Sequence, residues 1–209
     1  MLDKAVAILD AVGTGPLGLG ELLRVTGLPR ATGHRLAVAL EVHGLLRRDP
    51  EGRFTLGLHL VALGGAAAAT FPLAELARPA LDELRDATGE SVQLYVRDGT
   101  GRRCVASLDS PNELRTIVAV GSVLPLERGS AGKVLADPAW VSRRGWVESV
   151  EEREAGVASV SAPVRGADGV VLAAVSVSGP VGRTSRQPGR RYGEAVVRAA
   201  GMIEHATLH

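Results

Sequence analysis

The stretch LPRATGHRLAVAL, from Leu28 to Leu40, joins a basic opening to an apolar pattern with helical spacing. Its small and apolar residues recur at intervals of three and four positions, which predicts a helix over residues 29–43 with one buried face. That face consists of Gly33, Leu36, Ala37 and Leu40. Because glycine weakens a helix interior, Gly33 is expected to permit close packing on the preceding helix. The opposite face carries Arg30, Ala31, His34, Arg35 and Val38.

The flanking segments predict two earlier helices and a later hairpin. Residues 2–12 and 19–26 have helical spacing, and a tight turn at Gly27, expected to have a positive φ, follows the second. The apolar face expected for the first helix consists of Leu2, Val6, Leu9 and Val12. Residues 45–56 alternate around an Asp-Pro-Glu-Gly turn and predict a hairpin. This order is that of a winged helix-turn-helix, whose third helix enters the major groove of DNA.

Local charge supports this interpretation. Between Leu22 and Arg48 the chain has several arginines and a single acidic residue, Glu41. A basic patch on a helical surface is the expected footprint of phosphate binding. The candidate DNA-binding residues are Arg30, Ala31, Thr32, His34, Arg35 and, in the hairpin, Arg53.

Each of these residue types suits a different part of DNA. Arginine can pair bidentately with guanine, a small alanine can touch a thymine methyl group, and Thr32 at the helix start can hold a phosphate. Arg47, Arg48 and Arg53 flank the hairpin and can reach phosphate or a minor groove. The alternatives are a solvated helix face and charges that protect a hairpin edge from aggregation.

Composition and motifs exclude several other classes of protein. The chain has 209 residues, a formal net charge of +1 and a single cysteine, so an intramolecular disulfide is excluded. Apolar runs are too short to cross a membrane, and the acidic N-terminal stretch lacks a signal-peptide pattern, so we expect a cytoplasmic protein. Zinc-type spacing, phosphate-binding loops and catalytic triads are missing from the sequence. We therefore expect no metal, no cofactor and no enzymatic activity.

The second part of the chain predicts an α+β domain. A linker helix over 57–70 and a helix over 73–88 precede hairpins over 91–108 and 156–179. A further strand is expected at 114–121, together with helices at 130–136 and 188–208. The sheet is expected to carry its helices on one face.

Four serines of the later hairpin lie two residues apart within each strand, which places each pair on one face of the sheet. They are Ser159, Ser161, Ser176 and Ser178. Their hydroxyls suit a small polar ligand such as a carboxylate, and the alternative is cross-strand hydroxyl pairing or an exposed sheet face. Cys104, within a strand, is either a small buried apolar residue or a thiol sensor.

The chain resembles the IclR-type transcriptional regulators over nearly its whole length. The motifs that carry the resemblance are LPRATGHRLAVALEVHGLL, RPALDELRDATGES, VGSVLPLERGSAGKVLA and AVSVSGP. Three others, LRDATGESVQLY, GWVESVEEREAGVASVSAPVRG and QPGRRY, are most similar to the NdgR type, actinobacterial regulators of amino-acid-dependent growth implicated in leucine biosynthesis.

The resemblance implies a two-domain α+β protein: a winged helix-turn-helix over 1–56, a linker helix over 57–71, and a GAF-like effector-binding and oligomerisation domain over 72–209. It implies a homodimer or tetramer that binds a double-stranded DNA operator and is controlled by a small carboxylic acid or amino acid. The effector-binding residues carried over from the family are Ser130, Ala131, Ser149, Ser159, Ser176 and Ser178.

Two departures from the family concern the effector. Ser149 stands where family members place a carboxylate, and the junction between Ala136 and Ser142 is several helical turns shorter than usual. The short junction favours an alternative function: an effector-independent DNA-binding or protein-assembly module whose second domain only oligomerises.

Overall fold

The computed structural model of the chain describes residues 1–70, 72–141 and 143–208. The chain forms two compact units, Met1–Phe71 and Pro72–His209. Two residues that figured in the sequence analysis, Phe71 at the end of the expected linker and Ser142 at the short junction, lie outside the described residues.

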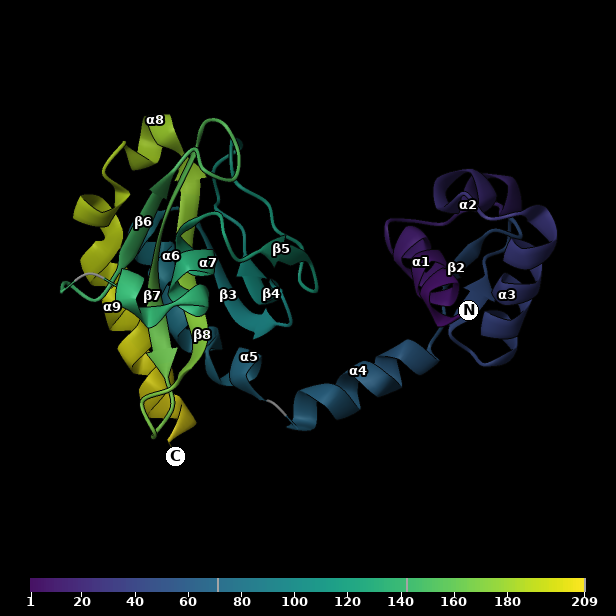
Figure 1. Cartoon of the computed structure of the whole chain (residues 1–209), viewed down its shortest axis with the longest axis horizontal. Helices are drawn as coiled ribbons and strands as arrows, with labels where there is room; N and C mark the ends of the chain where they lie inside the picture. The colour runs from purple at the N-terminus through teal and green to yellow at the C-terminus, as the bar shows by residue number, and fades with distance from the viewer. Residues whose placement is uncertain (71, 142, 209) are drawn as a thin grey trace. The chain divides into compact units, whose positions relative to one another are not determined.

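The first unit is a three-helix bundle with a small antiparallel hairpin (Figure 1). Its elements are α1 (Leu2–Gly13), α2 (Leu19–Thr26), α3 (Arg30–Val42), β1 (Leu46–Arg48) and β2 (Phe54–Leu56). Gly27 ends α2 with φ 66°, the left-handed conformation expected from the sequence. The core contains Ile8, Leu22, Ala37 and Phe54, each fully buried. The order of a winged helix-turn-helix is therefore confirmed.

The packing of α3 agrees with its sequence pattern, whereas that of α1 does not. Gly33 is buried, and a Cβ atom there would overlap the side chain of Leu23 in α2, so the predicted close approach is confirmed. The predicted apolar face of α1 was wrong at Leu2 and Val6, which are exposed. The buried residues of α1 are Ile8, Ala11 and Val12. They lie in its second half, since the first turns lie beyond the core.

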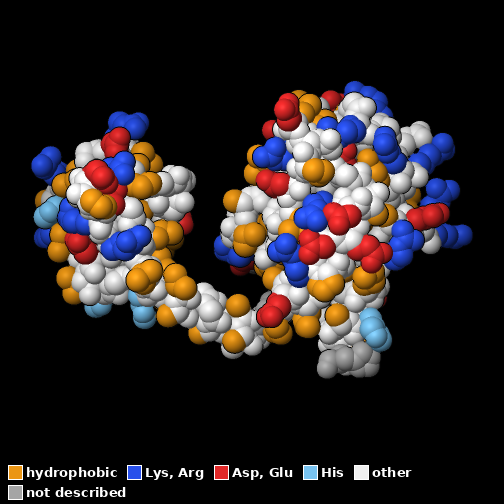
Figure 2. Space-filling view, turned by 180° about the vertical axis from the view of Figure 1, so that it is seen from behind, with side chains coloured by type: hydrophobic (Ala, Val, Ile, Leu, Met, Phe, Trp, Pro, Cys, Tyr) orange, Lys and Arg blue, Asp and Glu red, His pale blue; other side chains and the backbone are white. Residues whose placement is uncertain are grey.

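Helix α4 (His59–Thr70) follows the hairpin and has no buried residue among those described. Its sequence, HLVALGGAAAAT, contains no Lys, Arg, Asp or Glu, and Figure 2 shows this segment in orange and white. The start of α4 contacts the rest of the first unit through the hydrogen bond from His59 N to the carbonyl oxygen of Gly44, and most of the remaining residues of the helix are exposed.

The second unit is built on one antiparallel sheet of six strands in the order β5-β4-β3-β8-β7-β6. The strands are β3 (Ser91–Asp98), β4 (Gly101–Leu108), β5 (Val123–Pro125), β6 (Val147–Val150), β7 (Val157–Arg165) and β8 (Val171–Pro180). The remaining elements are α5 (Leu73–Leu76), α6 (Arg78–Thr88), α7 (Ser130–Ala136), the 3-10 turn η1 (Pro138–Trp140), α8 (Val181–Thr184) and α9 (Pro188–Thr207). Both predicted hairpins are confirmed.

Helices cover both faces of this sheet, so the expectation of one covered face was wrong. α6 and α9 pack on one face through a core that includes Leu94, Val160 and Val175 (Figure 1). α7 lies against the opposite face, over a smaller core that includes Cys104 and Ala174. Because side chains alternate along a strand, the serines on either side of Val160 and Val177 face α7.

Two further expectations were also wrong. Residues 114–121 are irregular, and the edge strand β5 begins only at Val123, where the chain pairs with β4. The helix expected over 73–88 is divided into α5 and α6, since Pro79 lacks a backbone N–H and suits the first turn of a new helix.

Candidate functional site

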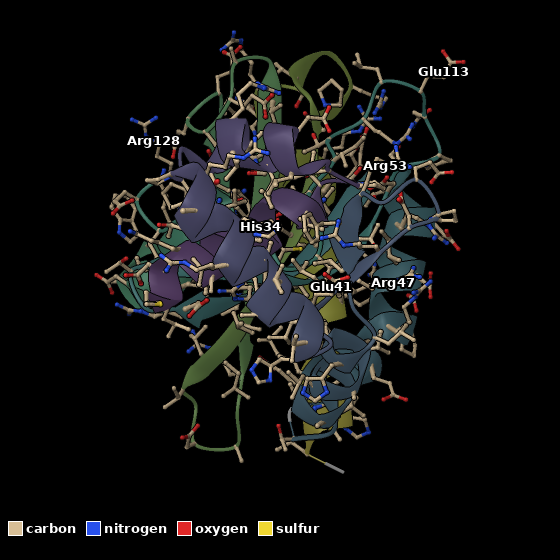
Figure 3. The ribbon with its side chains drawn as sticks, turned by 90° about the vertical axis from the view of Figure 1, so that its right-hand side faces the viewer. His34, Glu41, Arg47, Arg53, Glu113 and Arg128 are labelled. Atoms are coloured by element: carbon tan, nitrogen blue, oxygen red, sulfur yellow. The ribbon has the colours of Figure 1, made fainter. Side chains whose placement is uncertain are left out.

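The outward face of α3 presents four of the candidate DNA-binding residues to solvent: Arg30, Ala31, His34 and Arg35, with Thr32 half-buried. Figure 3 shows His34 on this face, with Arg47 and Arg53 on the adjacent hairpin. The buried residues Gly33, Ala37 and Leu40 hold the helix against the bundle from behind. Arg30, Ala31, His34 and Arg35 are therefore accessible from solvent.

Arg30 and Arg35 have no acidic partner among the residues that the structure describes. Neither belongs to an ion pair among the described residues, and Arg35 Nε donates a hydrogen bond to the carbonyl oxygen of Ala31 at 3.2 Å. An exposed guanidinium without a carboxylate partner is hydrated and free to exchange water for phosphate or a base edge.

The hairpin arginines differ from Arg30 and Arg35 in their ion pairing. Arg53 forms an ion pair with Asp49 at 2.8 Å and lies 3.5 Å from Glu51. Arg48 pairs with Glu41 at 3.2 Å, and its guanidinium lies 4.2 Å from the centre of the Phe54 ring. Arg47 has no acidic partner among the described residues, and its Nε donates to the carbonyl oxygen of Leu56 at 3.3 Å. Charge on the hairpin is therefore partly neutralised within the chain.

A pocket lies between the sheet and α7, and all six candidate effector-binding residues line it. They are Ser130, Ala131, Ser149, Ser159, Ser176 and Ser178. Ser159 is the register partner of both Ser149 and Ser178, on strands β6 and β8. Gly132 lets α7 approach closely, since a Cβ atom there would overlap the carbonyl oxygen of Leu126. The cavity volume is about 20 Å³, room for about one water molecule.

Ser130, Ser159 and Ser176 of the pocket belong to one hydrogen-bond network that runs through the neighbouring Ser161. The Ser130 hydroxyl lies 2.7 Å from the hydroxyls of Ser159 and Ser161, and Ser161 donates to Ser176 at 2.9 Å. Ser178 donates to Gln93 Oε1 at 3.0 Å. The cross-strand hydroxyl pairing considered from the sequence is therefore present, within the same pocket. These serines are satisfied without a ligand.

Seven residues that line the pocket were missed by the sequence analysis: Gln93, Tyr95, Arg102, Gly129, Arg153, Glu154 and Val157. Gln93 is fully buried on β3, and its Nε2 has no hydrogen-bond partner. A polar residue between Val92 and Leu94 in a strand was the available signal. The position of Arg102 had no such signal, because it follows from the approach of α7 and of the segment after β5.

Arg102 is a buried arginine, 3% exposed, on the strand β4 that faces α7. Its Nη1 donates to the carbonyl oxygens of Pro125 and of Arg128, the latter at 2.8 Å, while its Nε is buried without a partner. Burial lowers the pKa of this guanidinium, and the like charge of Arg153 adds to that effect. The pocket thus contains cationic charge and unused hydrogen-bond donors.

Cys104 is fully buried two residues after Arg102, as expected for a small apolar residue. Burial raises the pKa of its thiol to about 11, which disfavours the reactive thiolate. Over the described ranges, His, Cys, Asp and Glu side chains form no cluster able to hold a metal ion. Within the same ranges, none of the helices has both the length and the apolar character needed to cross a membrane.

Comparison with protein families gives two matches that together span most of the chain. Residues 1–50 match the IclR helix-turn-helix domain, and residues 65–141 and 138–205 match the bacterial transcriptional regulator IclR C-terminal domain. The two parts of the second match meet at the short junction after α7.

Individual relatives agree with these matches. The chain is 30% identical over 216 residues to the glycerol operon regulatory protein of Streptomyces griseus, covering 87% of this chain and 85% of that one. It is 24% identical over 240 residues to the transcriptional repressor IclR of Escherichia coli, covering 97% and 88%. The structure of an IclR homolog complexed with 4-hydroxybenzoate, from Microbacterium hydrocarbonoxydans, has a TM-score of 0.80 at 23% identity and 98% coverage of both chains. That likeness shows a shared fold.

Proposed function

The chain belongs to the IclR family of transcriptional regulators, and from this premise we propose which of its residues bind the operator and the effector. Membership makes it a DNA-binding regulator of transcription, and its relatives are regulators rather than enzymes. The operator, the effector and the genes it controls are the open parts of its function.

The operator is read by the start of α3. In this proposal Arg30, Ala31, His34 and Arg35 contact base edges, and Thr32 contacts a phosphate. The observation that carries the assignment is the exposed position of Arg30 and Arg35 on the outer face without acidic partners. Arg53 contributes from the hairpin through phosphate contacts, after exchanging Asp49 for DNA.

The effector is a small carboxylic acid or amino acid held by the pocket serines beneath α7. The convergence of six family-derived positions on one pocket supports this assignment. The protein acts as a homodimer or tetramer, so that two copies of α3 read half-sites about one helical turn apart. A ligand changes DNA affinity because it binds the two conformations of the assembly with different affinities.

The genes under control belong to amino-acid metabolism, in particular leucine and branched-chain biosynthesis. The motifs that resemble the NdgR type support this target. The likeness to glycerol operon regulatory proteins supports a glycerol operon as the competing target.

Fluorescence anisotropy tests the proposal. The full chain is titrated onto a duplex from its own upstream region and onto a scrambled duplex, across a salt series, with and without branched-chain amino acids and their precursor acids. Sequence-preferring binding is expected, and Arg30→Ala together with Arg35→Ala should remove the preference. Arg78→Ala is the matched control, because it removes an exposed arginine from α6.

Three results lead to different conclusions. A preference that a metabolite shifts supports the regulator with its effector. Weak binding that is equal on both duplexes and collapses with salt is phosphate attraction alone and contradicts this operator. A preference that no metabolite shifts favours the second candidate, an effector-independent DNA-binding module. Two observations favour that candidate: the short junction after α7, and the hydrogen bonds between serine hydroxyls that form without a ligand.

A further inference from the structure

Arg48, the last residue of β1, has partners from three parts of the first unit. Its Nε donates to both carboxylate oxygens of Glu41, at 3.2 and 3.3 Å, and its Nη1 donates to the carbonyl oxygen of Gly52 at 3.1 Å. Its guanidinium lies 4.2 Å from the centre of the ring of Phe54, its register partner on β2. A single side chain thus connects the end of α3 to the turn and the second strand of the hairpin.

The partners of Arg48 are themselves held in place. Phe54 is fully buried, and its backbone pairs with that of Leu17 through two hydrogen bonds of 3.0 and 2.8 Å. Glu41 lies in the last turn of α3, next to the buried Leu40. Figure 3 shows Glu41 on the side of α3 toward the hairpin residue Arg47. Because the partners of Arg48 lie on both α3 and the hairpin, its contacts restrict the angle between the two elements.

These contacts leave Arg48 poorly suited to bind phosphate. Its guanidinium already meets a carboxylate, a carbonyl oxygen and an aromatic face, which are the groups that a guanidinium binds best. The negative charge of Glu41 would also repel a phosphate that approached Arg48. Arg47, one residue earlier, has no acidic partner among the described residues. The two adjacent arginines therefore differ in what they offer to DNA.

We propose that Arg48 is a positioning residue for DNA binding: together with Glu41 it fixes the hairpin beside α3, and so sets where Arg53 lies relative to the base contacts of α3. The inference rests on the proposed binding of the operator by α3 and the hairpin. A hairpin whose orientation is already fixed loses less conformational freedom on binding. Loss of the Arg48–Glu41 contact should therefore weaken binding although no contact with DNA is removed.

The most informative variant is Glu41→Gln, because charge and positioning predict opposite results. Removing an acid close to DNA should strengthen binding if charge alone matters. If Glu41 acts through Arg48, operator affinity should fall by about threefold, the range of an exposed ion pair. Glu51→Gln is the matched control, since it removes another acid of the hairpin, one whose side chain is 64% exposed. The control should leave operator affinity unchanged or raise it, as measured by fluorescence anisotropy.

Variants of Arg48 separate positioning from a phosphate contact. In a positioning role, Arg48→Gln and Arg48→Lys should both lower operator affinity by about threefold, because lysine lacks the planar fork that meets all three partners. The dependence of affinity on salt should keep the wild-type slope. A phosphate contact would instead let Arg48→Lys keep most of the affinity, and Arg48→Gln would lower the slope by about one. The double variant with Glu41→Gln should bind no more weakly than Arg48→Gln alone.

Hydrogen exchange of the full chain without DNA measures the orientation of the hairpin directly. The amides of Asp49 and Gly52 donate within the turn, to the carbonyl oxygens of Arg53 and Asp49. They should exchange about threefold faster in Glu41→Gln and Arg48→Gln than in the wild-type chain, and at the wild-type rate in Glu51→Gln. Circular dichroism confirms that each variant is folded.

The results distinguish failure of this inference from failure of the proposed function. Absence of a sequence preference in the wild-type chain would overturn operator binding itself. With that preference present, stronger binding by Glu41→Gln or a lower salt slope in Arg48→Gln would overturn the positioning role. Unchanged hydrogen exchange in both variants would also overturn it, independently of any DNA.

Discussion

Two arginines of the second unit, Arg183 in α8 and Arg102 in β4, differ in how their charge is balanced. At the α8 end, Arg183 donates to both carboxylate oxygens of Glu90, at 2.6 and 2.8 Å, and Glu90 is 1% exposed. Beneath α7, Arg102 is buried against carbonyl oxygens and lacks a carboxylate partner among the described residues. The hydrogen bond to Glu90 raises the pKa of Arg183, whereas burial lowers that of Arg102.

The difference is that one arginine is neutralised by a carboxylate of the chain and the other has no such partner among the described residues. The Arg183–Glu90 pair is complete within the chain, and Gly179 leaves room for it, because a Cβ atom there would overlap the Glu90 carboxylate. Arg102 has similar chemistry without the partner.

The largest effect is expected for Arg183→Met. It leaves the buried Glu90 carboxylate unpaired, so the free energy of unfolding of the second unit should fall by roughly 3 kcal/mol. Urea unfolding measures this change. A loss below about 1 kcal/mol would mean that Glu90 is solvated or protonated instead, and that the comparison with Arg102 fails.

The first unit extends the comparison to exposed arginines. Arg30→Ala should lower operator affinity by about tenfold or more, equivalent to 1–3 kcal/mol, because Arg30 has no acidic partner to give up. Arg53→Ala should cost less, about threefold, because Asp49 and Glu51 already neutralise Arg53. Anisotropy on the operator duplex measures both variants. The reverse order would assign the main contact to the hairpin.

A smaller effect is expected for Arg102→Met in the absence of effector. Its hydrogen bonds to two carbonyl oxygens are lost, but an unneutralised buried charge is removed as well, so stability should change by less than about 1 kcal/mol in either direction. The urea experiment for Arg183→Met serves here too. A loss as large as that of Arg183→Met would show that Arg102 is structural.

The smallest effect on stability at neutral pH is expected for the protonation of the Cys104 thiol. Because burial raises the pKa of its thiol above the ordinary value of 9.0 to about 11, folding favours the protonated form. Its stabilising contribution is complete below pH 9 and is lost as the pH rises through 11. At pH 8 a thiol reagent should react about a hundredfold more slowly with the folded chain than with the unfolded chain. Similar rates would show that the β4 region opens readily.

Much of the fold was predictable because it depends on local pattern. The buried face of α3, the positive φ of Gly27 and both long hairpins follow from residue spacing and turn chemistry. The predictions that failed lacked such a pattern or depended on distant contacts. The exposed Leu2 of α1 and the irregular segment over 114–121 are examples.

The candidate sites divide in the same way. The outward residues of α3 follow from helical periodicity, and the alternation of Ser159 and Ser161 places both on one face of the sheet. That α7 covers this face was not predictable, because it depends on the chain crossing the sheet after β5. The pocket therefore gained Gln93 and Arg102 from strands whose sequence gave them no assigned role.

The sequence by itself determined the helix-turn-helix order, the basic face of α3 and the serine faces of two strands, since each depends on neighbours within a few residues. The tertiary structure alone decided which charges have partners. Arg53 meets Asp49 through the hairpin turn, Arg183 meets Glu90 across 93 positions of sequence, and Arg102 meets no carboxylate among the described residues. The physical reason is that an ion pair needs two side chains within a few ångströms, and that proximity is set by the packing of distant elements.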